Sequence, residues 1–457
     1  MSRQRSVAAA LLAGAAACFT AASSHAKTSW QLVYNQPNQG NALASVSAID
    51  ATNAWAIGVA QMGTSSSPIG IRTVDGVSWS PFTLPMGTGP LDLYLFLEIA
   101  FADAQVGWMG GVHLAALNQE NVLFRTDNGG STWTEALKPA AMIEQIHTLS
   151  TGEMFGVGGS ALVRSTDGIT AVESVVSVPA GLGLRGIYML NRDCGYAVAS
   201  SDPDSGGSQS VVLWTGDGGD TWEERGQDGS LRLDRIWFVS ADLGWAAGTS
   251  AAGAGIVARS TDGGRAWTAA TLPDHPPALG GQTAPVTECG DVRFFDDQRG
   301  VALCLCCTGE CDSDSPSYMT VFARTEDGGQ SWQMDPDYEL VMSAPPFGDM
   351  MKFSGMFDMA FPSPNAGYLV GQNNLVLRYS ADAPEAEGWG PADCSSGGVG
   401  GGGTSPPGGG AAPGAGDGSE EDSGCGCRVG PRRTSGPGGH AALALAAMAA
   451  VRRRRRR

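Results

Sequence analysis

The feature that most constrains the fold is a short motif that recurs along the chain. Three segments match Ser/Thr-x-Asp-x-Gly-x-x-Trp without a gap, and a fourth carries asparagine in place of the aspartate. Three further copies are eroded: one is a residue short, one lacks the tryptophan, and the last reaches its tryptophan, Trp389, late. The acidic or amide positions are Asp75, Asn128, Asp167, Asp217, Asp262, Asp327 and Asp382, and the tryptophans of the better copies are Trp79, Trp133, Trp222, Trp267 and Trp332. Spacings of 39 to 65 residues predict seven similar units of about four strands each.

A second sequence marker occurs at a regular place ahead of each copy of the motif. Ahead of each motif lies a short apolar segment, a turn, and then a small residue beside an aromatic one, as in Gly107-Trp108 and Gly244-Trp245. The third unit has Met154-Phe155 at this place, and the sixth has Gly300-Val301. Two markers in the same order, seven times over, indicate a repeat architecture, and no long segment has the periodicity of a helix.

The chemistry of the motif is structural. Hydroxyl and carboxylate groups of Ser, Thr and Asp hydrogen-bond the backbone of their own turn, and glycine supplies the positive φ that a tight turn needs. The tryptophan is expected to anchor the turn by packing between neighbouring sheets. The motif resembles the Asp-box, or bacterial neuraminidase repeat, which joins the last two strands of a β-propeller blade. This resemblance implies an all-β, seven-bladed propeller over residues 27–394.

A further segment, Ser29-Trp30-Gln31-Leu32-Val33, precedes the first unit and has no partner in it. It is similar to the strand that follows each motif, such as Ser331-Trp332-Gln333-Met334. We therefore expect it to complete the last blade and join the two ends of the ring.

The N-terminus has the pattern of a secretory signal. Arg3 and Arg5 precede an apolar run that ends in small residues, and this predicts a signal peptide over residues 1–26 with cleavage after Ala26. Lipid attachment at Cys18 is the alternative, but the residue three positions earlier lacks the usual bulky aliphatic side chain.

The C-terminus carries a second address. Residues 395–424 are rich in Gly, Pro and Ser and are expected to form a flexible linker. Residues 425–457 contain Cys425 and Cys427, a short apolar run and six final arginines. This arrangement resembles the MYXO-CTERM sorting signal, which implies cleavage by a dedicated sorting protease and display on the cell surface or outer membrane of a Gram-negative bacterium. An ordinary C-terminal membrane anchor with a basic flank is the alternative.

The charge of the chain is unevenly distributed. The 46 acidic and 28 basic residues give −18, but eleven of the basic residues lie at the two ends. The 17 that remain leave residues 27–427 at −29. This balance argues against binding a nucleic-acid backbone through bulk charge, and no nucleic-acid role is expected.

Arginine recurs about eight residues before the motif tryptophan. The set comprises Arg72, Arg125, Arg164, Arg259, Arg324 and Arg378. One hypothesis makes these residues a cationic belt that binds an acidic ligand such as an anionic polysaccharide. The alternative pairs each arginine with an acid on the neighbouring blade.

The cysteines indicate an oxidising compartment. The candidates for disulfide bonds cluster around the longest insertion, in the sixth unit: Cys289, Cys304, Cys306, Cys307 and Cys311. Two disulfides there would rigidify the insertion, although the pairing cannot be read from the sequence. A metal site built from Cys304, Cys306, Cys307 and Cys311 is the alternative, disfavoured because no histidine is nearby.

Function is less determined than fold. Paired motifs such as those around Gly244 to Gly248 make residues 29–390 similar to the photosystem II assembly and stability factor family, and this implies a binding or scaffolding module. Its partner is expected to be a protein or an extracellular polysaccharide, with no cofactor, no metal and no catalytic residues. The alternative is a glycan-active hydrolase, because sialidases share the turn motif; the Arg-Ile-Pro segment of sialidases does not occur here.

Overall fold

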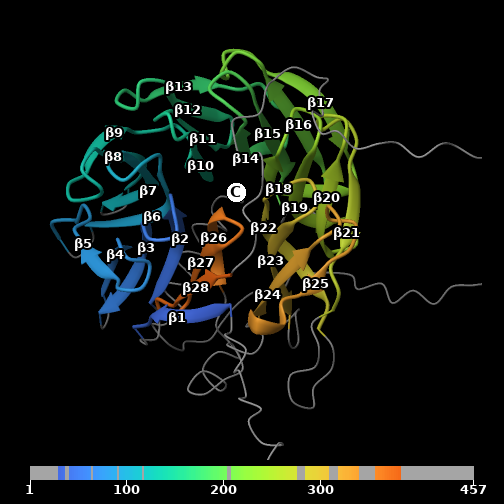
Figure 1. Ribbon diagram of the computed structural model, residues 1–457. Helices are drawn as coiled ribbons and strands as arrows, with labels where there is room; N and C mark the ends of the chain where they lie inside the picture. Colours follow the sequence, from blue (N-terminus) through green and yellow to red (C-terminus); the bar gives the residue numbers. More distant parts are fainter. Residues whose placement is uncertain are drawn as a thin grey trace, which may run out of the picture.

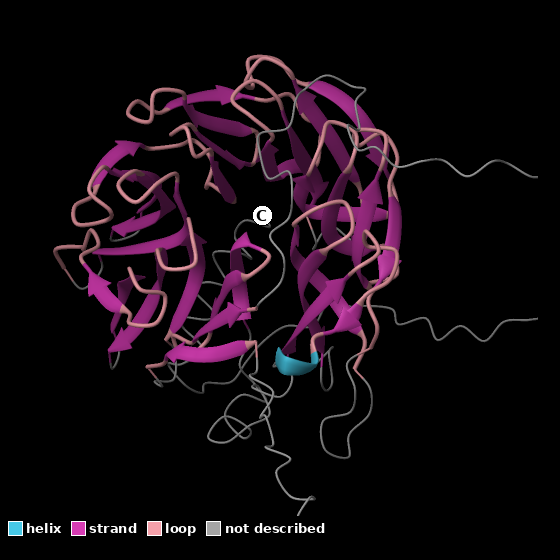
Figure 2. Cartoon of the chain, viewed as in Figure 1, coloured by secondary structure: helices cyan, strands magenta, loops and turns pink. Residues whose placement is uncertain are grey.

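Four-stranded antiparallel sheets repeat around a ring. The computed structural model describes residues 29–36, 41–62, 65–89, 92–115, 118–202, 207–274, 284–307, 318–338 and 356–381. Within these residues, 28 strands pair into seven sheets. Figure 1 shows the sheets as blades around a central axis, with the first strand of each blade innermost. The predicted seven-bladed propeller is confirmed, and Figure 2 shows that, apart from a helical turn at residues 336–338, the described regular structure is strand.

The first four blades follow the chain in order. Blade 1 contains β2 (Ala42–Ala48), β3 (Ala54–Met62), β4 (Ser65–Thr73) and β5 (Ser80–Phe82). Blade 2 contains β6 (Asp92–Phe101), β7 (Gly107–Ala115), β8 (Asn118–Thr126) and β9 (Thr134–Leu137). Blade 3 contains β10 (Gln145–Thr148), β11 (Met154–Gly158), β12 (Ala161–Ser165) and β13 (Val172–Val175). Blade 4 contains β14 (Leu182–Met189), β15 (Gly195–Ser201), β16 (Ser210–Thr215) and β17 (Glu223–Asp228).

The last three blades close the ring. Blade 5 contains β18 (Leu231–Phe238), β19 (Gly244–Ser250), β20 (Gly255–Ser260) and β21 (Thr268–Thr271). Blade 6 contains β22 (Val286–Phe294), β23 (Gly300–Cys307), β24 (Tyr318–Thr325) and β25 (Gln333–Met334). Blade 7 contains β26 (Met356–Ser363), β27 (Ala366–Gly371), β28 (Val376–Ser380) and, as its outer strand, β1 (Trp30–Tyr34). The N-terminal strand therefore completes blade 7, as expected, with Trp30 opposite Tyr379.

The ring has two different faces. The turn face holds the hairpin between the first and second strands of each blade, together with the turn motif between the third and fourth strands. The two are joined in the same blade, as where the amide of Gly129 donates to the carbonyl of Gln105 at 2.9 Å. The connection face, at the opposite end of the strands, holds the hairpins between second and third strands and the segments that lead to the next blade.

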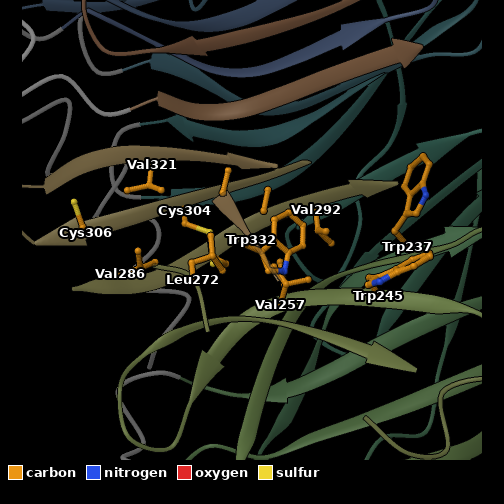
Figure 3. Close-up of a cluster of buried hydrophobic side chains, with 14 of the residues drawn as sticks. Trp237, Trp245, Val257, Leu272, Val286, Val292, Cys304, Cys306, Val321 and Trp332 are labelled. Carbon is orange, nitrogen blue, oxygen red and sulfur yellow. A yellow bond between two sulfur atoms is a disulfide. The ribbon is translucent and has the colours of Figure 1, made fainter. Parts of the chain in front are cut away.

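The hydrophobic core is divided among the interfaces between blades. A cluster of buried apolar side chains lies between each pair of neighbouring blades, including the pair formed by blades 7 and 1. Figure 3 shows the cluster between blades 5 and 6, with Trp237 and Trp245 at one end and Cys306 at the other. Second strands such as β15 are buried along their whole length because both of their faces are covered.

The small residue beside each aromatic has a steric cause. Gly244 lies opposite Phe238 in the sheet, and a Cβ atom on Gly244 would stand 2.5 Å from the phenyl ring. The same relation holds between Phe294 and Gly300. The ring of Phe294 in turn stacks on Trp245 of the preceding blade, with centroids 3.5 Å apart. The glycine makes room for a phenyl ring, and the neighbouring aromatic holds that ring between blades.

The turn motif shares its first hydrogen bond and its glycine conformation in all six copies that the structure describes. The hydroxyl of the first residue donates to the carboxylate or amide oxygen two positions later, at 2.8–3.1 Å. That oxygen also accepts backbone N–H groups of the turn, and the glycine that follows has φ between 66° and 76°. These N–H donors lower the pKa of the turn carboxyls, to about 2 for Asp167.

In the five described motifs that have a tryptophan, this side chain packs toward the preceding blade. Trp79 meets Tyr368 of blade 7 edge to face at 5.6 Å, and Trp222 packs against the cluster between blades 3 and 4. Trp133, Trp267 and Trp332 stand in the corresponding interfaces. In blade 3 the corresponding place is taken by Ala171.

Several sequence predictions fall on residues outside those described. These are the signal peptide with Ala26, the seventh motif with Asp382 and Trp389, Cys311, the linker over residues 395–424, and the sorting segment with Cys425 and Cys427. In the part of the chain that the structure describes, no helix is long and apolar enough to cross a membrane.

Candidate functional site

Blade 3 is shorter than its neighbours. Its four strands have 4, 5, 5 and 4 residues. In blade 2, by contrast, β7 and β8 have 9 residues each, and in blade 4 β14 has 8. Four residues of strand correspond to a length of about 13 Å. The six blades whose turn motifs lie among the described residues keep them at the turn face, so the missing length leaves a gap in the connection face.

A pocket of about 390 Å³ occupies this gap, and we call it the blade 3 notch. Blade 2 and the segment that leaves it contribute Gln119, Asn121, Ala140, Ala141, Met142 and Glu144. The blade 3 hairpin and the elements of blade 4 contribute Gly159, Gly181, Leu182, Gly183, Arg185 and Asp202. Its volume is in the range of small-ligand and side-chain pockets, and its lining combines polar with apolar side chains.

The walls of the notch are fixed by hydrogen bonds. The Asn121 amide donates to the carbonyls of Pro139 and Ala140, both at 3.1 Å. The Glu173 carboxylate accepts the N–H of Ala140 at 2.9 Å. At the floor, the N–H of Leu184 donates to the carbonyl of Gly159 at 2.7 Å. Both connecting segments are therefore held in place without a ligand, which reduces the entropy lost on binding.

Charged side chains close the inner end of the notch. Arg185 lies 3.3 Å from Glu144, and both are largely buried. The guanidinium of Arg235, in blade 5, donates to the carbonyls of Arg185 and Glu144 and pairs with Glu98 of blade 2 at 3.2 Å. Because blades 3 and 4 stand between blades 2 and 5, Arg235 reaches across the axis of the ring. We call Glu98, Glu144, Arg185 and Arg235 the axial network.

A second group of charges lies on the first strands of blades 5 to 7. Arg232 pairs with Asp234 at 2.9 Å, and Asp291 lies 3.6 Å from Arg293. Asp358 accepts the N–H of Val46 at 2.8 Å. Burial and the nearby Asp291 carboxylate raise the pKa of Asp358 to about 6, so this carboxyl titrates near neutral pH.

The six arginines of the predicted belt lie at one level near the turn face. Each stands opposite the residue of the second marker, as in the pairs Trp55–Arg72 and Trp245–Arg259. The positions are Arg72, Arg125, Arg164, Arg259, Arg324 and Arg378, on the third strand of every blade except blade 4. None of them lines the notch, which is at the other end of the strands.

Three of these arginines donate to the turn of the following blade. Arg72 reaches the carbonyl of Gly129 at 2.9 Å, and Arg125 reaches that of Gly168 at 2.5 Å. Arg164 donates to the carbonyl of Gly218 at 2.8 Å and also to the Asp220 carboxylate. Arg324 instead pairs with Asp335 of its own blade and donates to the Tyr379 hydroxyl of blade 7 at 2.9 Å. Among these four arginines, Arg164 pairs with an acid of the neighbouring blade as the alternative expected, whereas the others bind backbone carbonyls, the Tyr379 hydroxyl or an acid of their own blade.

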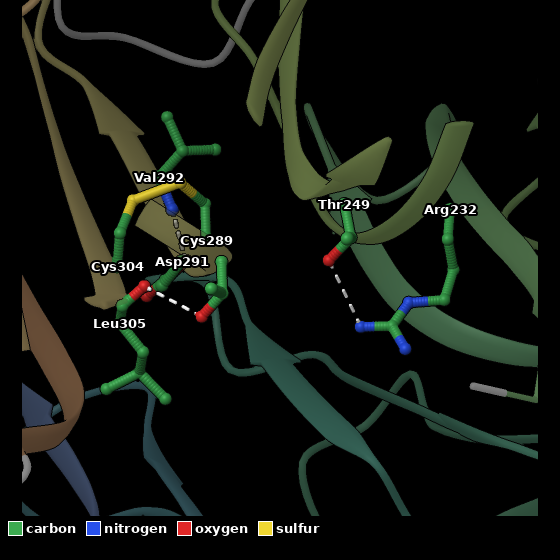
Figure 4. The surroundings of a disulfide bond; sticks show 8 residues. Arg232, Thr249, Cys289, Asp291, Val292, Cys304 and Leu305 are labelled. Atoms are coloured by element: carbon green, nitrogen blue, oxygen red, sulfur yellow. Dashed lines mark hydrogen bonds between the residues drawn. A yellow bond between two sulfur atoms is a disulfide. The ribbon is translucent and has the colours of Figure 1, made fainter. Parts of the chain in front are cut away.

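The cysteine cluster forms a bond inside a sheet. Cys289 on β22 and Cys304 on β23 are direct partners in the strand register and form a disulfide (Figure 4). This bond ties the innermost strand of blade 6 to the next strand, whereas the sequence had suggested that disulfides would staple the insertion. Cys306 is buried on the same strand, and Cys307 is the last residue of β23. Among the described residues, no group of three or more His, Cys, Asp or Glu side chains is placed to hold a metal ion.

Neither the notch nor the axial network was predicted from the sequence. Glu98, Glu144, Arg185 and Arg235 belong to neither of the two sequence markers. Glu98 and Arg235 occupy equivalent positions on the first strands of their blades, three residues before the phenylalanine that ends each strand, but the residue type at that position varies from blade to blade. One signal was available: the motif positions Asn128 and Asp167 are separated by 39 residues, the shortest interval of the series. The same unit has lost its tryptophan, so blade 3 was already marked as the exception.

Fold and site together define the chain as a seven-bladed β-propeller with a notch on its connection face. The solved structure of YCF48 bound to a D1 peptide superimposes with a TM-score of 0.51 at 20% identity, over 77% of this chain and 97% of that chain. YCF48 from Cyanidioschyzon merolae gives 0.49 at 16% identity, over 77% and 98%. The Hadza microbial sialidase Hz136 gives 0.40 at 10% identity, over 76% and 68%.

At these low sequence identities, the similarities concern the fold alone. No protein-family model matches the sequence, and no curated protein matches it significantly.

Proposed function

We propose that this chain is a binding or scaffolding propeller that receives a segment of a partner protein in the blade 3 notch. The observation that carries the proposal is the notch itself, a preformed pocket with mixed polar and apolar lining at the place where the short strands of blade 3 leave a gap in the connection face. The fold it shares with YCF48, which has been solved bound to a D1 peptide, supports a polypeptide as the partner. An extracellular polysaccharide is the other ligand class that the test below includes.

The proposal includes a location. The signal peptide pattern over residues 1–26 and the MYXO-CTERM-like segment over residues 425–457 support export and display at the cell surface or outer membrane, after cleavage by a sorting protease near Cys425 and Cys427. Attachment would then be through the sorting segment itself or a later anchor. Terminal peptide mapping of the surface protein should find a chain that begins at Lys27 and ends near Cys425. A cytoplasmic chain with its final arginines intact would refute the location.

The binding proposal is tested by filling the notch. Leu182→Arg places a long charged side chain in the pocket, and Val77→Arg, at an exposed position of the turn face, is the matched control. The full chain is presented to a displayed library of random peptides and to a glycan array. Ligands selected on the natural chain should bind Leu182→Arg at least about tenfold more weakly and Val77→Arg equally well. Equal binding to both variants would refute the notch as the site.

A hydrolase remains the second candidate because of Asp358. A carboxyl group whose pKa is raised to about 6 beside a second carboxylate, Asp291, has the character of a general acid. Generic glycosides incubated with the chain should show turnover that Asp358→Asn abolishes, if this candidate is right. The asparagine keeps an oxygen acceptor for the Val46 amide, so the variant is expected to fold. Absence of turnover on ligands that the chain binds would leave the binding function.

A further inference from the structure

Within the part of the chain that the structure describes, the outer strand of blade 3 has an unpaired edge. β13 is the last strand of its sheet, and it pairs on its inner side with β12. The N–H of Val176 points inward to the carbonyl of Ser160 at 2.8 Å. Because successive residues of a strand point their backbone groups to alternate sides, the N–H and C=O groups of Glu173 and Val175 point outward. They form a short row of backbone donors and acceptors at the rim of the ring.

This edge is also apolar. Val175 is 81% exposed, Val172 is 50% exposed, and Ile169 in the preceding turn is 65% exposed. These are three of the six large apolar side chains that are exposed among the described residues. The turn of blade 3 lacks the motif tryptophan, and its outer strand carries aliphatic side chains where most other blades carry polar or charged ones.

Several of the other outer strands are protected against pairing. β5 contains Pro81 and β17 begins with Glu223, Glu224 and Arg225, whereas β9, like β13, has a single glutamate at the same register position. β25 has only two residues, and β21 has only threonine and alanine. Proline, charge and short length are the usual means by which proteins block the edge of a sheet. β13 combines an open edge with large exposed aliphatic groups.

The edge leads into the notch. β13 runs from the turn face to the connection face, and the chain that follows it contributes Gly181 and Leu182 to the notch lining. Glu173 of β13 holds Ala140, which also lines the notch. Four residues of strand bury too little surface for a stable complex by themselves, so a second copy of the chain paired through β13 alone would bind weakly. A segment that follows the edge and then enters the notch would bury more.

We infer that the partner polypeptide adds to β13 as a fifth, antiparallel strand, with the residues that precede this strand lying in the notch. The inference rests on the proposed function and names the form of the ligand. The antiparallel direction is the commoner one for paired strands, and strand addition at a free edge is a general mode of peptide recognition.

The register predicts a sequence pattern for the partner. Read from its N-terminus, the added strand would stand opposite Val175, Ser174, Glu173 and Val172 in turn. Aliphatic side chains are favoured opposite the two valines, and a basic side chain is favoured opposite Glu173. The expected pattern is therefore aliphatic–polar–basic–aliphatic.

The test uses two double variants at equivalent positions. Val172→Lys with Val175→Lys charges the edge of blade 3. Thr268→Lys with Thr271→Lys places the same charges at the same register positions of β21 in blade 5. Peptides are selected from a displayed random library on the natural full chain, and the affinity of an enriched peptide is measured by fluorescence anisotropy for both variants and for Leu182→Arg.

We expect the selected peptides to be enriched in the aliphatic–polar–basic–aliphatic pattern. Their affinity should fall by at least about tenfold for the blade 3 edge variant and by less than about twofold for the blade 5 variant. If Leu182→Arg weakens binding while the blade 3 edge variant does not, strand addition is wrong and the notch proposal stands. If no peptide is enriched, both proposals are overturned. Far-UV circular dichroism of each variant verifies that the propeller is folded.

Discussion

Blades 3 and 5 share one topology but differ in how they meet their neighbours. In blade 5, Phe238 lies over Gly244, and Trp245 stacks on Phe294 of blade 6 while its indole N–H donates to the carbonyl of Gly328 at 2.9 Å. In blade 3 the corresponding pair is Thr148 and Met154. The larger side chain of this pair is therefore on the second strand, whereas in blade 5 it is on the first.

The two blades also differ in their outer parts. Blade 5 has Trp267 in its turn motif, whereas blade 3 has the small Ala171 at that place. The second marker of blade 3 is Phe155, which has no indole donor for the next turn. The complete set of repeat residues therefore makes the contacts between neighbouring blades. Blade 3 lacks part of this set and has shorter strands, and both a pocket and an exposed strand edge are available there for another molecule.

The largest effect that separates the two blades should come from their equivalent aromatics. Trp245→Ala removes a fully buried ring, a stacked neighbour and a hydrogen bond, and we expect the free energy of unfolding to fall by about 4 kcal/mol. Phe155→Ala removes a buried ring alone and should cost about 3 kcal/mol. Urea unfolding followed by far-UV circular dichroism measures both. Equal losses would show that the indole contacts add nothing to burial.

A smaller effect should distinguish the arginines of the same blades. Arg164 donates to Gly218 and Asp220 of blade 4, and Arg164→Ala should lower the free energy of unfolding by about 2 kcal/mol. Arg259 makes no comparable hydrogen bond within the described residues, so Arg259→Ala should cost about 1 kcal/mol or less. Ligand binding in the notch should be unchanged in both variants. If folded Arg164→Ala lost ligand binding, the result would support the hypothesis that the arginines form a ligand-binding cationic belt.

The smallest effect concerns the turn carboxylates, whose geometry the two blades share. Backbone N–H groups of Thr170 and Ile169 hold the pKa of Asp167 at about 2, below the ordinary value of 3.8. A lowered pKa in the folded state gives stability that is present above pH 4 and is lost as pH falls toward 2. Asp167→Asn introduces the residue type that blade 2 already has at Asn128. It keeps the acceptor and should lose less stability between pH 4 and pH 2.

The same substitution in blade 5 is the control for this prediction. Asp262 also has a lowered pKa and accepts the same kind of N–H donors. Asp262→Asn should therefore also lose less stability than the natural chain as the pH falls from 4 to 2. Thermal melting at a series of pH values measures the slopes. A variant with the natural slope would show that the turn carboxylate does not contribute to acid stability.

Features that rest on repeated residue types could be predicted from the sequence, whereas contacts between single residues of distant blades could not. Seven motif copies predicted seven blades, and the similarity of the Trp30 segment to later strands predicted the closure of blade 7, because each rests on local residue types that recur. The disulfide lay among the predicted cysteines, but its pairing came from the strand register that places Cys289 opposite Cys304. The axial network joins single residues from separate blades, and no local pattern encodes such contacts.

The closure of blade 7 determines how the ring would carry a load. β28 lies between β27 and β1, and the amide of Ser380 donates to the carbonyl of Ser29 at 2.8 Å. A chain held at its C-terminal side would transmit tension to β28 along the strand direction. Several hydrogen bonds on both sides of β28 would then be loaded in shear at once. The N-terminal strand would therefore act as a mechanical lock for whatever holds the molecule at its other end.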